Sequence, residues 1–300
     1  MIQRLPPVTY PSIKHLLLDR LQVVLDLYVS DSSVLNQRNR QISLHRSKDN
    51  RRVLYVWAIA LQLSKAKNIP ALEIATTLAS LLRKVGANSG TAISCEFTVH
   101  VIPPGWIHLE LTEPKLAAWL QHLAQGELGE LREQGKHVKN PYSPLAPRPS
   151  SSRLFAVQYA HARCCSLVQM AHREGLITLL SSPTPPTLFR AVAPDPIPWL
   201  NFDQIRLCHP TERALIVQLL GLLDDFYCPC PILQSIDWEK AALNLSQAFQ
   251  AFYSCCRIWG EVKIQTIHLA QARLGLIMAT QQILRLLLQD RLGVYAPVEL

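Results

Sequence analysis

The sequence predicts an α+β protein, in which a small N-terminal α/β domain with helices on an antiparallel sheet precedes an all-α helix bundle. Apolar residues repeat every three or four positions over most of residues 153–300, which is typical of helices. Residues 1–125 instead contain both helical and strand-like runs. Between them, residues 126–152 are polar and then rich in proline and serine, as in an exposed linker. We therefore expect two domains joined by a tether.

The first domain combines helices with at least two strands. Helices are expected where apolar residues have helical spacing, over residues 12–29, 53–66, 71–85 and 114–124. Strand-like runs cover residues 91–101 and 107–111, with the turn sequence Pro103-Pro104-Gly105 between them. This order suits helices packed on a small antiparallel sheet.

The second domain is predicted from three apolar stripes at helical spacing. The stripes lie in residues 157–171, 242–256 and 269–286. Each stripe must be buried against another apolar surface, and the three stripes can bury one another. A helix bundle follows.

Positive charge is concentrated in the first half of the chain. Residues 1–152 hold 18 Lys/Arg against 11 Asp/Glu, and the remainder holds 12 against 11. The densest run, opposed only by Asp49, contains Arg38, Arg40, Arg46, Lys48, Arg51 and Arg52. Such a cluster attracts nucleic-acid phosphates, although a solvated loop beside a helix start explains it equally well.

Membrane, export and metal functions are not indicated. No stretch approaches the roughly 20 apolar residues of a membrane span, and the N-terminus lacks the layout of a signal peptide. The eight cysteines contain no C-x-x-C pair, so no metal site is expected. Buried reduced thiols suit a soluble, cytoplasmic protein.

Three segments of the second domain resemble one family in the same order. They are residues 155–163 (FAVQYAHAR), 245–257 (LSQAFQAFYSCCR), and 271–276 (QARLGL) with 292–297 (LGVYAP). They are similar to the anticodon-binding bundle, or DALR domain, of arginyl-tRNA synthetases. The family usually ends Ala-Pro-Glu-Arg-Met, whereas this chain ends Ala-Pro-Val-Glu-Leu.

The first domain resembles the additional N-terminal domain of the same family, which grips the outer corner of tRNA. The similar segments are residues 58–65 (AIALQLSK), 69–75 (IPALEIA) and 104–109 (PGWIHL). Trp57 stands where the family has an asparagine. The catalytic signatures of class I synthetases, His-x-Gly-His and a Lys-Met-Ser-Lys-type loop, do not occur in the sequence. The resemblance therefore implies two RNA-binding modules without the activating domain, and no cofactor.

The resemblance implies an anticodon interface on the bundle. Tyr159 and Arg163 lie four residues apart, as do Tyr253 and Arg257, so each pair is expected to share a helix face. A ring beside a guanidinium suits unstacked bases. Leu300 replaces the terminal methionine that contacts RNA in the family. The alternative is that each tyrosine packs between helices.

The resemblance also implies a contact with the tRNA corner. Trp106 and His108 alternate with Ile107, so we expect both to point away from the core, where the family uses an aromatic and an amide to hold a D-loop base. Histidine does not reproduce the paired hydrogen bonds of an amide. Arg51 and Arg52 would contact phosphates.

The expected ligand is tRNA, most simply arginine tRNA, bound without catalysis. Two other functions remain open at this stage. One is a synthetase-derived scaffold that binds a protein partner, which the nearly neutral second domain favours. The other is an accessory part of a split arginine–tRNA ligase.

Overall fold

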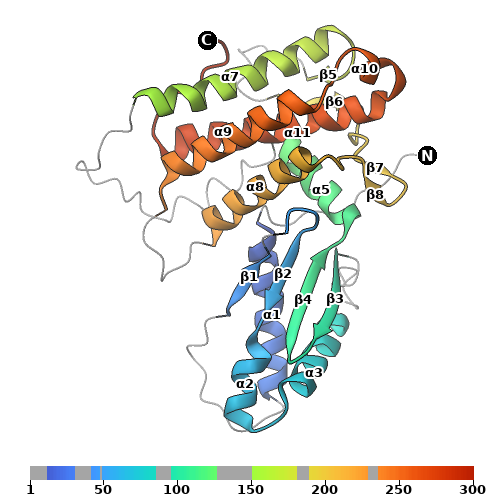
Figure 1. Ribbon diagram of the computed structural model, residues 1–300, viewed down its shortest axis with the longest axis vertical. Helices are drawn as coiled ribbons and strands as arrows, with labels where there is room; N and C mark the ends of the chain where they lie inside the picture. The colour runs from blue at the N-terminus through green and yellow to red at the C-terminus, as the bar shows by residue number, and fades with distance from the viewer. Residues whose placement is uncertain are drawn as a thin grey trace. The chain divides into compact units, whose positions relative to one another are not determined.

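The computed structural model describes residues 12–30, 42–47, 49–85, 96–126, 151–180, 189–228 and 236–300. Its contacts divide these residues into two units, Ser12–Leu116 and Ala117–Leu300. The first contains a small antiparallel sheet and the second is mainly helical (Figure 1). The predicted α+β class is confirmed.

The first unit is built on a four-stranded sheet. Its strands are β1 (Leu44–Arg46), β2 (Leu54–Trp57), β4 (Trp106–Leu111) and β3 (Phe97–Ile102), in that order, all pairing antiparallel. Helix α3 (Ala71–Lys84) packs on β3 and β4, α2 (Ile59–Lys67) also meets β4, and α1 (Ile13–Ser30) packs on α3. Gly105, in the turn between β3 and β4, leaves no room for a Cβ, because that atom would lie 2.8 Å from Ala71 Cβ.

The predicted helix over residues 53–66 is wrong in its first part. Residues 54–57 form strand β2, and α2 begins only at Ile59. Leu-Tyr-Val-Trp suits a strand, because β-branched and aromatic side chains pack well on a pleated sheet. Tyr55 and Trp57 are fully buried. The three-residue strand β1, within the basic run, was not predicted.

The other elements of this unit lie close to their predicted positions. Helices α1, α3 and α5 (Glu113–Ala124) and strand β4 begin and end within one residue of the predicted limits. Strand β3 covers the end of the predicted run over residues 91–101, whose first five residues lie outside the described part.

The second unit is a helix bundle, as predicted. Its helices are α7 (Ser151–Arg173), α8 (Pro210–Tyr227), α9 (Trp238–Cys255), the short α10 (Glu261–Gln265) and α11 (Ile267–Leu286), which continues into a π-helical turn, Leu287–Arg291. Helix α11 contacts α7, α8 and α9, and nearly all of it is buried. The apolar residues that form the three stripes are all buried, except for the half-buried Leu269.

Two features of the bundle were not predicted. Helix α8 lies in a segment for which no stripe was recognised. The pairs β5 (Thr178–Leu179) with β6 (Ala191–Ala193), and β7 (Leu200–Asn201) with β8 (Gln204–Ile205), are small antiparallel ladders between α7 and α8. The second unit is therefore helical with two short β-ladders, not purely α.

The division between the units differs from the expected domain limits of 125 and 153. Helix α5 crosses it, and its second half belongs with the bundle. There Gln121 Oε1 accepts hydrogen bonds from Ile197 N (3.0 Å) and Trp199 Nε1 (2.8 Å). At the other limit α7 already begins at Ser151. Of the expected linker, residues 127–150 lie outside the described part.

The ring of Trp199 packs directly against Gly275 on α11, and this close contact gives a stability prediction. A Cβ on Gly275 would lie 2.5 Å from Trp199 Cη2. Gly275→Ala is therefore expected to destabilise the bundle by about 1–3 kcal/mol, although alanine favours a helix by about 1 kcal/mol over glycine. Urea unfolding followed by circular dichroism measures the change. Adding Trp199→Phe to Gly275→Ala should restore part of the lost stability, because the smaller ring leaves room for the new methyl group. An unchanged urea midpoint for Gly275→Ala would contradict the close contact between Gly275 and Trp199.

Candidate nucleic-acid interface

Two predicted site residues from different helices meet on the bundle. Arg163 Nη2 on α7 donates a hydrogen bond to Tyr253 Oη on α9 at 2.9 Å, and its guanidinium carbon lies 5.2 Å from the ring centroid. Arg163 is exposed and Tyr253 half-buried. The Tyr253 ring also stacks on buried Phe249, with centroids 6.2 Å apart. Tyr253 is thus partly a packing residue, as the alternative interpretation held, but it is only half-buried and lies beside the exposed Arg163 guanidinium.

A second aromatic pair lies near the start of α7. Tyr159 is 48% exposed and stacks on Phe155, which is 57% exposed, with ring centroids 6.4 Å apart and planes inclined by 27°. Exposed aromatic pairs of this kind offer flat surfaces to unpaired bases. Phe155 was not singled out from the sequence, although its spacing of four residues from Tyr159 signals the pair.

The C-terminal segment lies along the same helix. The carbonyl oxygen of Tyr295 accepts a hydrogen bond from Gln158 Nε2 at 2.8 Å, and that of Pro297 lies 2.7 Å from His161 Nδ1. Tyr295 and the terminal Leu300 are exposed. The structure therefore ties the segment that ends in Leu300 to the helix that carries Tyr159 and Arg163.

His161 is a buried structural residue, and it makes stability depend on pH. Because a carbonyl only accepts, Nδ1 donates to Pro297, and Nε2 then accepts from Gln281 Nε2 at 2.8 Å. Burial lowers the pKa of His161, partly offset by the Pro297 bond. As pH falls below the ordinary value of about 6.5, the unfolded chain takes up this proton before the folded one. His161 thus stabilises the fold above that pH, and this contribution is lost as pH falls towards the folded-state pKa.

We accordingly expect the free energy of unfolding to fall below pH 6.5, by at most about 1.4 kcal/mol per pH unit from this group. Urea unfolding at pH 7.5 and 5.5 measures it. His161→Gln should show a smaller difference between the two pH values than the wild type. An equal difference in the variant would assign the pH dependence to other groups.

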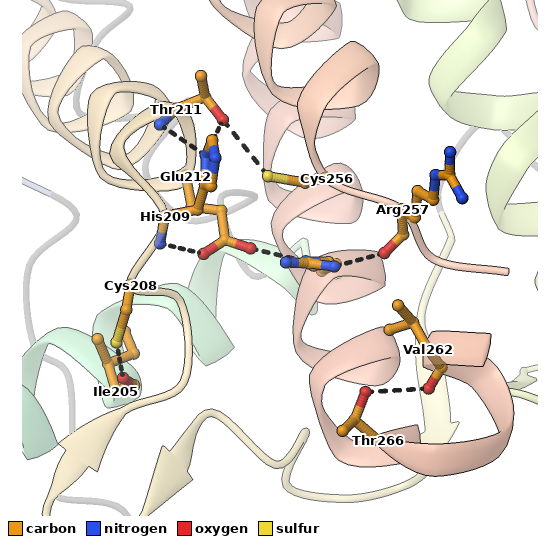
Figure 2. Close-up of polar contacts among 10 residues, drawn as sticks. Ile205, Cys208, His209, Thr211, Glu212, Cys256, Arg257, Val262 and Thr266 are labelled. Atoms are coloured by element: carbon orange, nitrogen blue, oxygen red, sulfur yellow. Dashed lines mark hydrogen bonds and ion pairs between the residues drawn. The ribbon is translucent and has the colours of Figure 1, made fainter. Parts of the chain in front are cut away.

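Arg257 does not share a helix face with Tyr253, so that part of the prediction is wrong. Helix α9 ends at Cys255, and Arg257 lies beyond this end as an exposed residue between the buried Cys256 and Ile258. Its carbonyl oxygen accepts a hydrogen bond from Arg273 Nη1, while its guanidinium points away from this contact (Figure 2). The four-residue spacing failed because the helix ended two residues too early.

A buried network holds the backbone of Arg257 in place (Figure 2). Arg273 Nε on α11 donates to Glu212 Oε1 at 2.6 Å, and Glu212 Oε2 accepts from His209 N at 2.8 Å. Together with the His209 side chain, this second bond forms the capping box of α8. Glu212 is only 1% exposed. The network therefore links the start of α8, the segment after α9 and helix α11 by hydrogen bonds, which the sequence did not reveal.

In the first unit, Trp106 and His108 point away from the core as predicted. Both are half-buried, whereas Ile107 between them is fully buried. His108 lies in the register row that joins Val56 on β2 and His100 on β3. Burial lowers the pKa of His108, and the nearby charges of Arg52 and His100 lower it further.

Arg51 and Arg52 are exposed, but both are paired. Arg51 Nε lies 3.1 Å from Asp49 Oδ1, and Arg52 Nη1 lies 3.2 Å from Glu110 Oε2. Hydrogen bonds from Arg51 lower the pKa of the Asp49 carboxyl. The sequence showed Asp49 as the only opposing charge, because Glu110 is distant in the chain and is brought close by the pairing of β2 with β4. Arg38, Arg40 and Lys48 of the basic run lie outside the described residues.

The cysteines are only partly the buried thiols expected. Cys164, Cys165 and Cys256 are buried, and burial raises the pKa of Cys165 to about 12. Cys208 and Cys255 are exposed. The described residues hold no group of three or more His, Cys, Asp or Glu side chains placed to bind a metal ion. None of the described helices has the length and apolar character needed to cross a bilayer.

Comparison with known proteins matches part of the bundle to a known domain family. Residues 200–300 match the model of the DALR anticodon binding domain. That match covers α8, α9, α10 and α11, including Tyr253 and Arg257, whereas α7 lies before it.

Curated relatives match the C-terminal half of the chain. The arginine–tRNA ligase of Synechococcus sp. (strain JA-3-3Ab) is 31% identical over 141 residues, 47% of this chain and 21% of that protein. The ligase of Heliobacterium modesticaldum is 31% identical over 154 residues, 51% of this chain and 24% of its own length. The matches thus span about a fifth to a quarter of these relatives. No solved structure matches the chain significantly.

Proposed function

We propose that the protein binds tRNA, with arginine tRNA as its first ligand, in the cytoplasm and without charging it. The contact between Arg163 and Tyr253 carries this proposal. It joins a guanidinium and a phenol at the surface of a unit whose residues 200–300 match an anticodon-binding domain. One part of that surface can stack bases and the other can donate hydrogen bonds to them.

The proposed anticodon grip combines stacking with hydrogen bonding. The exposed rings of Phe155 and Tyr159 offer a flat surface, and each base stacked on such a surface contributes roughly 1–3 kcal/mol. A guanidinium has five N–H donors, so Arg163 keeps donors for base edges after it bonds Tyr253. Arg257 adds a second exposed guanidinium, and its backbone carbonyl is bonded to Arg273. Leu300 would make only an apolar contact.

The proposed second grip lies on the sheet of the first unit. Trp106 offers a ring on the side of β4 that points away from the core, and His108 offers one hydrogen bond beside it. Arg51 and Arg52 would meet phosphates, although each must share its charge with a carboxylate.

The absence of catalysis is part of the proposal and has a direct test. The sequence contains neither of the signatures that bind ATP in class I synthetases. The purified chain is therefore expected to give no ATP–pyrophosphate exchange and no arginyl-tRNA, measured with radiolabelled pyrophosphate and arginine. Activity that follows the protein through a second purification step would refute this part.

A protein-interaction scaffold is the second candidate, favoured by one observation. Residues 153–300 hold 12 Lys/Arg against 11 Asp/Glu, whereas RNA-binding surfaces are usually basic. The anticodon grip described above depends on stacking more than on net charge, so the two candidates predict different binding to tRNA.

A further inference from the structure

The register of the sheet aligns three histidines across three of its strands. His45 on β1 pairs with Val56 on β2, Val56 pairs with His108 on β4, and His108 pairs with His100 on β3. Directly paired residues of antiparallel strands point to the same face. His45, His108 and His100 therefore form one row, here called the histidine row, on the face that also carries Trp106.

The histidine row lies at the surface. His45 and His100 are exposed and His108 is half-buried, whereas the neighbouring positions Tyr55, Ile107 and Leu109 point to the core and are fully buried. His45 Nε2 also meets Ser43 Oγ at 2.8 Å. A ligand that lies across the strands can thus reach all three imidazoles.

The fixed charges beside the row cancel in pairs. Arg51 is paired with Asp49, and Arg52 with Glu110, whose position on β4 is two residues from His108. On β3, His100 is the only ionisable side chain among the residues that point to this face, and Val56 on β2 carries no charge. Two other cations lie near the row: Arg46 follows His45 on β1 but pairs in register with the core-facing Tyr55, and Arg83 of α3 donates a hydrogen bond to Val99 O on β3. Between pH 7.5 and 6.0 these arginines keep their charge, so the change in positive charge comes from protons on the imidazoles.

The spacing of the row suits successive anionic groups better than a single metal ion. Adjacent strands lie about 4.8 Å apart, so His45 and His108, two strands apart, are separated by roughly 10 Å. A shared metal would need each imidazole nitrogen at about 2.1 Å. Separate groups along an extended polyanion can instead each meet one imidazole.

We propose that the histidine row binds RNA phosphates when protonated, so that this face grips tRNA more tightly as pH falls from 7.5 to 6.0. The inference rests on the proposed tRNA-binding function and deepens it. Trp106, on the same face, would stack a base while the imidazoles meet the neighbouring phosphates. Histidine is the side chain whose charge changes in this range of pH.

The direction of the effect follows from linkage. A bound phosphate favours the charged form of an imidazole, so binding takes up protons and affinity rises as pH falls. Burial and the charges of Arg52 and His100 lower the pKa of His108 in the free protein. His108 is therefore protonated less readily than an ordinary imidazole, so the test replaces the other two histidines of the row.

The test is filter binding of a transcribed arginine tRNA to the full chain at pH 7.5 and 6.0, with Mg²⁺ held constant. We expect affinity to rise about tenfold in the wild type, because each proton taken up contributes up to about tenfold per pH unit. The variant with both His45→Gln and His100→Gln should change by less than about threefold by the same relation. His268→Gln, which removes an exposed histidine of the bundle, is the matched control and should behave as the wild type.

The salt dependence gives a second readout that needs no variant. If protonated imidazoles meet phosphates, affinity should fall more steeply with salt at pH 6.0 than at pH 7.5. Binding with the same affinity and salt slope at both pH values, or an unchanged pH effect in the double variant, would overturn the histidine row while leaving tRNA binding intact. If no tRNA binds at either pH, the proposed function fails with it.

Discussion

Glu212→Ala is expected to destabilise the helical unit by about 3–5 kcal/mol, the cost of breaking one partner out of a buried ion pair. Glu212 is 1% exposed, and it accepts from Arg273 and from the backbone of His209. Its removal leaves the Arg273 guanidinium, whose side chain is 12% exposed, without its carboxylate. It also removes half of the capping box of α8. Urea unfolding followed by circular dichroism measures the loss.

An exposed ion pair in the same unit is the control. Lys263 and Glu174 meet at 2.8 Å, but each side chain is 35% exposed. Glu174→Ala should therefore cost no more than about 1 kcal/mol. Glu212→Gln, which keeps an acceptor for the cap, should lie between the two. Equal effects for Glu212→Ala and Glu174→Ala would show that the buried network does not hold the three helices together.

Arg163→Glu is expected to weaken tRNA binding by about 10–100-fold, equal to roughly 1.4–2.8 kcal/mol. The change removes the donor to Tyr253 and places a negative charge where RNA would approach. Arg163→Lys keeps the charge but loses the planar array of donors, so an intermediate loss is expected. Filter binding of arginine tRNA, with unfolding curves to confirm that each variant is folded, gives the values.

A charge reversal elsewhere on the bundle separates a local contact from net charge. Lys240 is exposed near the start of α9, thirteen residues from Tyr253 and hence about 20 Å along the helix. Lys240→Glu makes the same change in charge and should alter affinity by less than about threefold. If Lys240→Glu and Arg163→Glu weaken binding equally, the Arg163–Tyr253 contact is not part of the interface.

Local apolar spacing predicted the bundle well, because burial of a helix stripe depends mainly on residues three and four apart. The stripe that ends at Leu286 shows this: it forms α11, which is buried on nearly every side. The failures lie where a distant residue decides. Residues 54–57 became a strand because β4 pairs with them, and α9 ended before Arg257 without a proline or glycine to signal it.

The sequence indicated which residues belong to the candidate sites, but it did not indicate which of them contact one another. Tyr253 and Arg163 were selected separately from two segments, each with its own neighbour, yet they contact each other across 90 positions of sequence. The pairing of Arg52 with Glu110 spans 58 positions and changes the expected charge of the sheet face. Such partners depend on strand register and helix packing, which spacing along one segment does not contain.

We propose above that the helical unit reads the anticodon of a tRNA through the surface around Arg163 and Tyr253. The most direct measurement is filter binding of arginine tRNA to the full chain over a salt series, beside the same tRNA with its anticodon replaced. We expect the arginine tRNA to bind at least about tenfold more tightly, and this preference to persist as salt weakens both, because stacking and base-edge bonds resist salt. Equal affinity of the two tRNAs at every salt concentration would contradict anticodon reading. Failure to bind tRNA below about 100 μM at low salt would contradict it too, because non-specific attraction alone often reaches that affinity.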